Sequence, residues 1–333
     1  MRYFWPVLLT VLLAFSTTFS LKAQEPQTLA EYEQSLKQLL NKVATETDAE
    51  KRSTYNQKLI PTLVKALKLD DSFEYSFDKL RQMSVLTAPD NSFRIFTWIL
   101  KQDNKKVETA DTLFKEEIFE TQTYRYYGTI QMNTNTVGTM VLHPLIDNTD
   151  TLEQIDKMQL ASNQWYGAVY YNMIQKEHNG KQYYMLFGWR NSTPISDKKL
   201  IEVIHFEDGK PIFGAPIFNT VIDEKKEVKH RFMLEFNNRS SISVNYDEAQ
   251  DLILYDHLEP PDEKSKEMYH AYMPDGTYEG FSFQNGTWQH VPKVFKLSNE
   301  DILQDNPAMS RERPKGEIKL YDPKRKKTKT KKE

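Results

Sequence analysis

The chain has 333 residues, with 44 Lys and Arg against 47 Asp and Glu, and it contains no cysteine. The missing thiols exclude a disulfide framework, a thiolate-bound zinc or iron–sulfur site, a cysteine nucleophile and a lipid-modified N-terminal cysteine. Only 11 glycines accompany 18 Tyr, 18 Phe and 5 Trp, a balance that disfavours glycine-rich phosphate loops. Length and 39% hydrophobic content allow a substantial core.

The first 23 residues have the pattern of a secretory signal peptide. Arg2 is followed by nineteen uncharged residues with an apolar centre at Val7–Phe15, and a small residue, Ala23, stands at the expected cut. An uncleaved membrane anchor is the alternative, but hydroxyl residues at 16–20 favour cleavage after Ala23. The sequence therefore predicts export to the periplasm, the outer membrane surface or the medium, and no integral membrane protein after cleavage.

Residues 24–70 are predicted to form a helical hairpin packed on the body of the protein. Thr28–Glu31 and Thr47–Glu50 each have the capping-box pattern at the start of a helix, and Pro61 should kink the second helix. An accessory subunit docked through this hairpin is an alternative role. The first helix is indicated by apolar residues at steps of three and four: Leu29, Tyr32, Leu36, Leu39, Leu40 and Val43.

Residues 71–297 are predicted to form a large antiparallel β body, so that the fold is mainly β and α+β overall. In Phe93–Leu100 the odd-numbered and the even-numbered residues are both mainly apolar, which indicates a strand buried on both faces. A sandwich or twisted multi-stranded sheet is favoured. A β-propeller-like body is the alternative, because Pro89–Phe93 and Pro274–Tyr278 repeat one turn pattern. Short connections exclude a parallel βαβ sheet, and they carry hairpin residues at Asn179-Gly180, Asp208-Gly209, Asn237-Asn238, Asp275-Gly276 and Asn285-Gly286.

The C-terminal end is predicted to be an irregular extension over 298–323 and a disordered basic tail over 324–333. Loss of Arg2 and Lys22 with the leader leaves 42 basic against 47 acidic residues, a net charge of −5. The last ten residues carry a net +6, so the rest of the mature chain carries −11. We expect an anionic polymer, a lipid surface or an envelope protein as partner and no nucleic acid, and a purely solubilising tail is the alternative. The basic residues are Lys324, Arg325, Lys326, Lys327, Lys329, Lys331 and Lys332.

Standard catalytic and cofactor motifs are missing from the sequence. It has no Walker loop, G-x-G-x-x-G, G-x-S-x-G, H-E-x-x-H or EF-hand loop. No cofactor or local metal site is therefore predicted, although a metal site assembled across strands stays open. None of the seven histidines has another at i+2 or i+4: His143, His178, His205, His230, His257, His270 and His290.

Weak catalytic candidates gather where a predicted strand runs into a proline loop. Asp256, His257 and Glu259 precede Pro260-Pro261, and Asp275 follows in the next turn. Adjacent strand residues point to opposite faces, so a turn-bonding aspartate and a surface histidine are the simpler interpretation. A glycoside hydrolase would need two of these carboxylates about 5–9 Å apart.

Aromatic residues suggest a carbohydrate-binding surface as a second kind of site. Indole and phenol rings stack on apolar faces of ligands, but they also fill large β cores. The candidates are Trp98, Trp165, Tyr166, Trp189 and Trp288.

One group of segments carries a family resemblance: 72–78, 88–98, 165–168, 187–189, 213–218, 256–258 and 274–278. Together these segments resemble a family of uncharacterised exported proteins of Bacteroidota. The resemblance implies an envelope or secreted location, and no functional residue can be carried over because the family has no assigned activity. The leading hypothesis is thus a non-catalytic binding or structural module of the cell envelope, with a hydrolase acting on cell-surface carbohydrate as the alternative.

Overall fold

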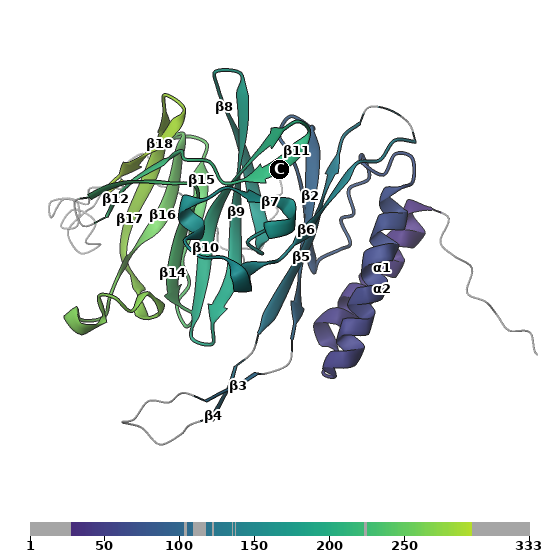
Figure 1. The fold of residues 1–333 in the computed structure, drawn as a ribbon, viewed down its shortest axis with the longest axis horizontal. Helices are drawn as coiled ribbons and strands as arrows, with labels where there is room; N and C mark the ends of the chain where they lie inside the picture. The colour runs from purple at the N-terminus through teal and green to yellow at the C-terminus, as the bar shows by residue number, and fades with distance from the viewer. Residues whose placement is uncertain are drawn as a thin grey trace, which may run out of the picture.

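The computed structural model places the folded body and leaves the two ends undescribed (Figure 1). The signal peptide, the C-terminal extension and the basic tail all lie outside the described residues. None of the helices in the described part is both long and apolar enough to cross a membrane. The described residues are 28–102, 105–108, 118–121, 123–134, 136, 138–222 and 225–294.

Two helices, α1 (Leu29–Thr45) and α2 (Ala49–Leu67), open the fold. The capping box predicted at Thr28 is confirmed: its hydroxyl accepts from the Glu31 N–H at 3.3 Å, and the Glu31 carboxylate accepts from the Thr28 N–H at 3.0 Å. The second cap is Asp48 and not Thr47, because the Asp48 carboxylate accepts from the N–H of Lys51 at 2.9 Å.

The first sheet has the strand order β1-β2-β5-β6, and the helices pack on one of its faces. Leu36 and Leu63 of the helices share a core with Trp98 of β2. A separate pair, β3 (Lys105–Glu108) and β4 (Ile118–Thr121), forms a two-stranded ribbon. The strands of the first sheet are β1 (Met83–Thr87), β2 (Phe93–Lys101), β5 (Tyr124–Met132) and β6 (Leu142–Ile146).

The second sheet has the order β7-β11-β10-β9-β8, with β14 also paired to β10. Its strands are β7 (Leu160–Ala161), β8 (Val169–His178), β9 (Lys181–Thr193), β10 (Ser196–Glu207), β11 (Lys210–Phe213) and β14 (Phe232–Asn237). The third sheet has the order β13-β12-β18-β17-β16-β15. Its strands are β12 (Phe218–Ile222), β13 (Lys225–Lys229), β15 (Val244–Asp247), β16 (Leu252–Glu259), β17 (Met273–Gln284) and β18 (Thr287–Val291).

The helical hairpin and the three sheets are stacked in four layers, with a hydrophobic core in each gap (Figure 1). Residues of β2 and β9 alternate between cores: Ile95 and Leu186 belong to the core between the first and second sheets, while Phe187 belongs with Phe281 to the core between the second and third. The double-sided burial predicted for β2 is confirmed, since its other face carries Phe96 into the helix core.

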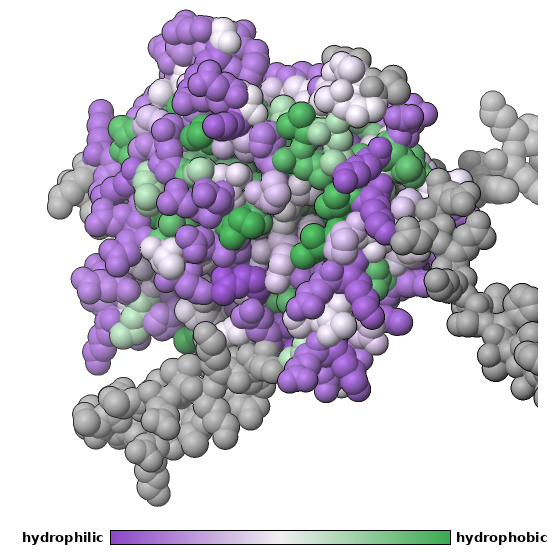
Figure 2. Space-filling model, turned by 45° about the vertical axis from the view of Figure 1, so that its right-hand side comes forward, coloured by the Kyte–Doolittle hydropathy of each residue, from purple (hydrophilic) through white to green (hydrophobic). Residues whose placement is uncertain are grey.

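The mainly β prediction is confirmed, with antiparallel pairing everywhere among the named strands except the parallel pair β12–β18. Sheets of four, six and six strands differ from the equal four-stranded blades of a propeller. The face shown in Figure 2 is largely hydrophilic, although hydrophobic residues gather near its middle.

Three predicted hairpin turns are confirmed by positive φ at both central residues: Asn179-Gly180, Asp208-Gly209 and Asn285-Gly286. Two others are corrected. Asn237-Asn238 leads from β14 of the second sheet to β15 of the third, so it joins unpaired strands. Asp275-Gly276 lies inside β17, where the extra residues form a bulge.

Candidate functional site

The weak catalytic candidates at the end of β16 are divided between the two faces of the third sheet. His257 lies on the face of the buried Tyr255, because both side chains hydrogen-bond to Glu279, and Glu259 lies beside His257. Asp256 points the other way, and its carboxylate accepts a hydrogen bond from the backbone N–H of Ser243.

A bulge in β17 brings Asp275 to His257. The register passes from Asp256↔Tyr278 to Leu258↔Pro274, so the three residues 275–277 face His257 alone. One oxygen of Asp275, Oδ1, accepts from the N–H and the hydroxyl of Thr277, both at 2.8 Å. Bulges of this kind redirect a side chain without ending the sheet.

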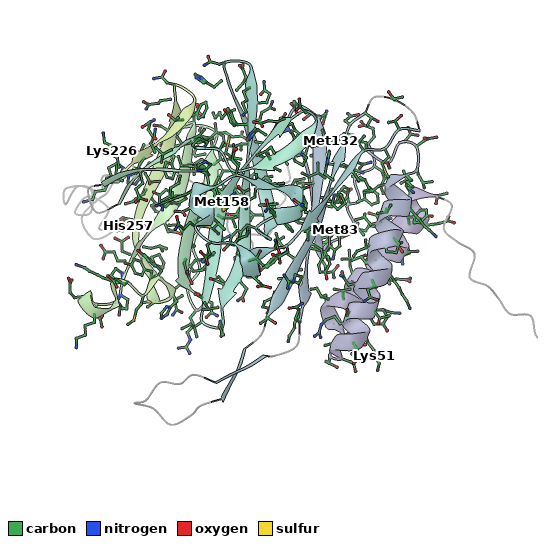
Figure 3. All side chains as sticks on the ribbon, in the orientation of Figure 1. Lys51, Met83, Met132, Met158, Lys226 and His257 are labelled. Atoms are coloured by element: carbon green, nitrogen blue, oxygen red, sulfur yellow. The ribbon has the colours of Figure 1, made fainter. Side chains whose placement is uncertain are left out.

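His257, Glu259 and Asp275 converge at this point, and we call them the His257 site (Figure 3 labels His257). Each offers a ligand atom, and these atoms all lie within 4.8 Å of one another. His257 Nε2 is 3.7 Å from Glu259 Oε1. Ligand atoms around a tetrahedral metal ion are about 3.4 Å apart, so small side-chain rotations would close the set. The His257 side chain is 33% exposed, which leaves the site open to ions from solvent.

Glu279 of β17 supports the site from behind. Its Oε1 accepts from His257 Nδ1 at 2.9 Å, and its Oε2 accepts from the Tyr255 hydroxyl and from His290 Nε2, also at 2.9 Å each. An ionised carboxylate can only accept, so the proton of a neutral His257 ring is on Nδ1. Nε2, which lies 3.7 Å from Glu259 Oε1, then carries the lone pair. This is the arrangement in which an outer carboxylate orients a metal-binding imidazole.

Hydrogen bonds and nearby charges lower the pKa of two acids of this region, Glu279 and Asp275. Burial acts to raise the pKa of Glu279, but hydrogen bonds from His290 and Tyr255 and the nearby histidine charges outweigh it, and the pKa is lowered. Burial likewise acts to raise the pKa of Asp275, but the Thr277 hydrogen bonds and His257 lower it. Burial and then the Glu279 charge raise the pKa of Tyr255, so its hydroxyl stays a donor.

Sequence reasoning did not single out Glu279 or His290. One signal was present for Glu279: it alternates with Phe281 and Phe283, so it is a charged residue in the inward-facing series of an otherwise apolar strand face. Its partners could not be derived, because the register between β16, β17 and β18 is set by contacts far apart in sequence.

The aromatic candidates are distributed over three different cores. Trp98 lies in the helix core, Trp165 and Tyr166 lie between the first and second sheets, and Trp288 lies between the second and third. These four side chains are all less than 5% exposed, whereas Trp189 is partly exposed. They therefore stabilise separate layers instead of sharing one binding surface.

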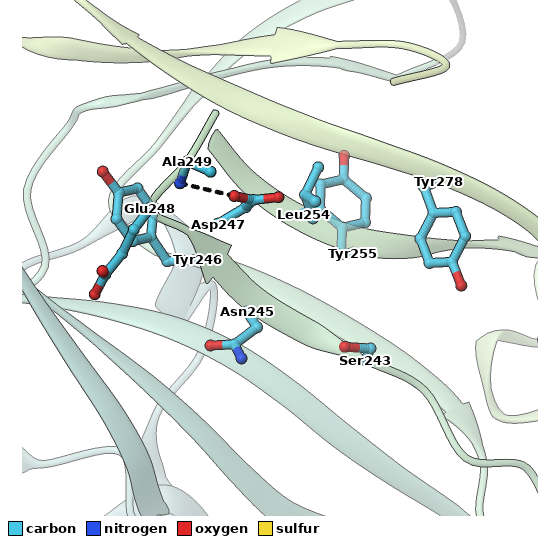
Figure 4. Close-up of a pocket in the computed structure, with 9 residues that line it drawn as sticks. All are labelled: Ser243, Asn245, Tyr246, Asp247, Glu248, Ala249, Leu254, Tyr255 and Tyr278. Carbon is cyan, nitrogen blue, oxygen red and sulfur yellow. Dashed lines mark hydrogen bonds between the residues drawn. The ribbon is translucent and has the colours of Figure 1, made fainter. Parts of the chain in front are cut away.

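Two cavities lie apart from the His257 site. One, of about 590 Å³, is lined by residues that include Ser92, Tyr184 and Phe206. The other, of about 510 Å³, lies over β15, β16 and β17 and is shown in Figure 4. None of the three His257 site residues lines either cavity.

Comparisons with family models, curated proteins and solved structures found no match to this chain. Function is therefore inferred from the geometry of the described residues.

Proposed function

We propose that the protein is an exported, non-catalytic envelope protein that binds a divalent metal ion at the His257 site. One observation carries the proposal: ligand atoms of His257, Glu259 and Asp275 lie within 4.8 Å of one another while His257 Nδ1 is held by Glu279. An imidazole with two carboxylates suits first-row divalent ions such as Zn²⁺, and water or a partner group would complete the coordination.

The exposure of the His257 site favours a moderate affinity for the metal ion and ready exchange of the ion with solvent. Glu259 is 62% exposed and must lose side-chain freedom when it binds the metal ion. We therefore expect a dissociation constant in the micromolar range, which is weaker than that of a buried structural metal site. Protons compete with metal ions for imidazole and carboxylate ligands, so affinity should fall as the pH is lowered.

An extracytoplasmic location is supported by the leader sequence with its cut after Ala23 and by the resemblance to exported proteins of Bacteroidota. The basic segment Lys324–Lys332 supports attraction to an anionic polymer, an anionic lipid surface or an acidic envelope protein.

A hydrolase acting on cell-surface carbohydrate is the second candidate function. It is favoured by one observation, the two carboxylates of Glu259 and Asp275, which have oxygens within 4.8 Å of each other. Retaining glycosidases hold their two carboxyl groups about 5–5.5 Å apart. Both residues are exposed at a strand end and line neither cavity, so metal binding is the better supported function.

The test is calorimetric titration of the mature chain, residues 24–333, with Zn²⁺, Mn²⁺ and Ca²⁺ separately. We expect saturable binding of one Zn²⁺, weakened by about tenfold or more in each of His257→Gln, Glu259→Gln and Asp275→Asn. Glu263→Gln, in the exposed loop after β16, is the matched control and should leave affinity unchanged. Absence of saturable binding, or equal binding by the three variants, would overturn the proposal.

A further inference from the structure

The outer face of the third sheet carries an acidic hollow, which we call the β15–β17 groove (Figure 4). Its volume is about 510 Å³. Asn245 and Asp247 contribute from β15, Leu254 from β16 and Tyr278 from β17, and Glu248 closes one end. The groove thus combines carboxylates with an exposed aromatic ring, since Tyr278 is 39% exposed.

Strand register adds a third carboxylate to this face. Asn245 pairs with Leu254, and Asp256 pairs with Tyr278, so Asp256 lies on the same side as the groove residues. It accepts from the N–H of Ser243, which also lines the groove. The Asp247 carboxylate is held in place by the N–H of Ala249 at 2.9 Å (Figure 4).

The described chain ends beside this groove. After β18, the N–H of Val294 donates to the carbonyl of Tyr278 at 3.0 Å. The Val294 side chain lies over Gly280, where an added Cβ would be 3.1 Å from Val294 Cγ2. Val294, the last described residue, is therefore in contact with a groove residue.

We propose that the basic segment Lys324–Lys332 binds in the β15–β17 groove of its own chain. The first reason is opposite charge. The segment has seven basic residues, the groove face has Asp247, Glu248 and Asp256, and the mature chain without its last ten residues carries a net charge of −11.

Reach is the second reason. About 30 residues separate Val294 from the basic segment, so the chain is long enough for the segment to return to a groove beside Val294. Attachment at the rim therefore raises the local concentration of the segment to about the millimolar range. A weak intrinsic affinity is then sufficient for occupancy, and this binding is independent of metal at the His257 site.

The first experiment compares two forms of the mature protein by fluorescence anisotropy. A labelled peptide of residues 324–333 is titrated with the body truncated after Pro323 and with the full chain, at about 20 mM and about 500 mM NaCl. We expect the truncated body to bind at low salt and the full chain to bind about tenfold more weakly, because its own tail fills the groove. Equal binding by the two forms, or no binding by the truncated body, would refute docking in cis.

The second experiment locates the surface with two variants of equal charge. The groove variant Asp247→Asn/Glu248→Gln/Asp256→Asn keeps the hydrogen-bond acceptors but removes three charges, and it should weaken peptide binding about tenfold or more. The control variant carries the same charge change in the loop between β16 and β17, at Asp262→Asn/Glu263→Gln/Glu267→Gln, and should stay within about twofold. An equal loss in both variants would mean general charge attraction and would sink the groove assignment.

Discussion

Replacement of Glu279 by Gln tests how the fold prepares His257. The carboxylate accepts from His257 Nδ1, His290 Nε2 and the Tyr255 hydroxyl, each at 2.9 Å. A glutamine keeps one acceptor oxygen and turns the other position into a donor. If its oxygen stays with Tyr255 and His290, its NH₂ faces His257 Nδ1, and the ring must move its proton to Nε2. The lone pair on Nε2 is then lost.

The size of the effect follows from this change of tautomer. Loss of an outer carboxylate partner lowers metal affinity by about 10- to 100-fold, which is about 1.4–2.7 kcal/mol. Neutral hydrogen bonds replace the charge-assisted bonds of the carboxylate, which should also reduce the free energy of unfolding of the metal-free protein by about 1–3 kcal/mol.

Three measurements separate these effects: Zn²⁺ titration, urea unfolding of the metal-free protein, and ¹⁵N chemical shifts that report the His257 tautomer. Glu207→Gln is a matched control, because Glu207 accepts from His205 at 3.0 Å in a His–Glu pair on the second sheet. It should leave Zn²⁺ affinity within about twofold. A Glu279→Gln protein with the proton on Nε2 but unchanged Zn²⁺ affinity would refute the reasoning.

Three further predictions concern stability and the tail. Glu202→Gln should cost about 3–5 kcal/mol in urea unfolding, because it leaves the fully buried Arg231 guanidinium unpaired; a loss under about 1 kcal/mol would contradict this. Burial, and then the Lys181 charge, lower the pKa of His205 although Glu207 opposes this. Neutral His205 thus contributes fully to the free energy of unfolding above about pH 6.5, and this contribution is lost as the pH falls below that value. His205→Gln should therefore make the free energy of unfolding depend less on pH between about pH 7 and 5. An unchanged slope would exclude this role. Truncation after Pro323 should abolish binding to vesicles with anionic lipid, and salt should weaken binding of the full chain; retained or salt-independent binding would rule out the tail as the contact.

Local patterns predicted the elements well where one physical cause dominates. The Thr28 cap and the double-sided β2 strand followed from capping chemistry and period-two burial. The sequence alone does not fix the N-cap of α2, because the side chains of Thr47 and Asp48 can both accept a hydrogen bond from a helix N–H. Only the geometry of the helix selects Asp48.

The Asp-Gly pairs show why turn residues alone could not distinguish a hairpin turn from a bulge within a strand. Asp208-Gly209 and Asp275-Gly276 both place Gly at positive φ. The first closes a hairpin and the second forms a bulge inside β17. Positive φ is required in both settings, so the dipeptide cannot report which partner strand lies opposite.

The candidate site could be predicted only in part, because the local sequence does not report which strand lies opposite. The run Tyr255–Glu259 suggested one polar cluster, but strand alternation assigns His257 to the inner face and Asp256 to the outer face. Cross-strand register then supplies what the local sequence cannot: Glu279 behind His257 on one face, and Tyr278 beside Asp256 on the other. A single strand therefore contributes to two chemically different surfaces, a histidine–carboxylate site and an acidic groove. Substitutions at Asp256 and His257 should consequently separate tail binding from metal binding, even though the residues are adjacent.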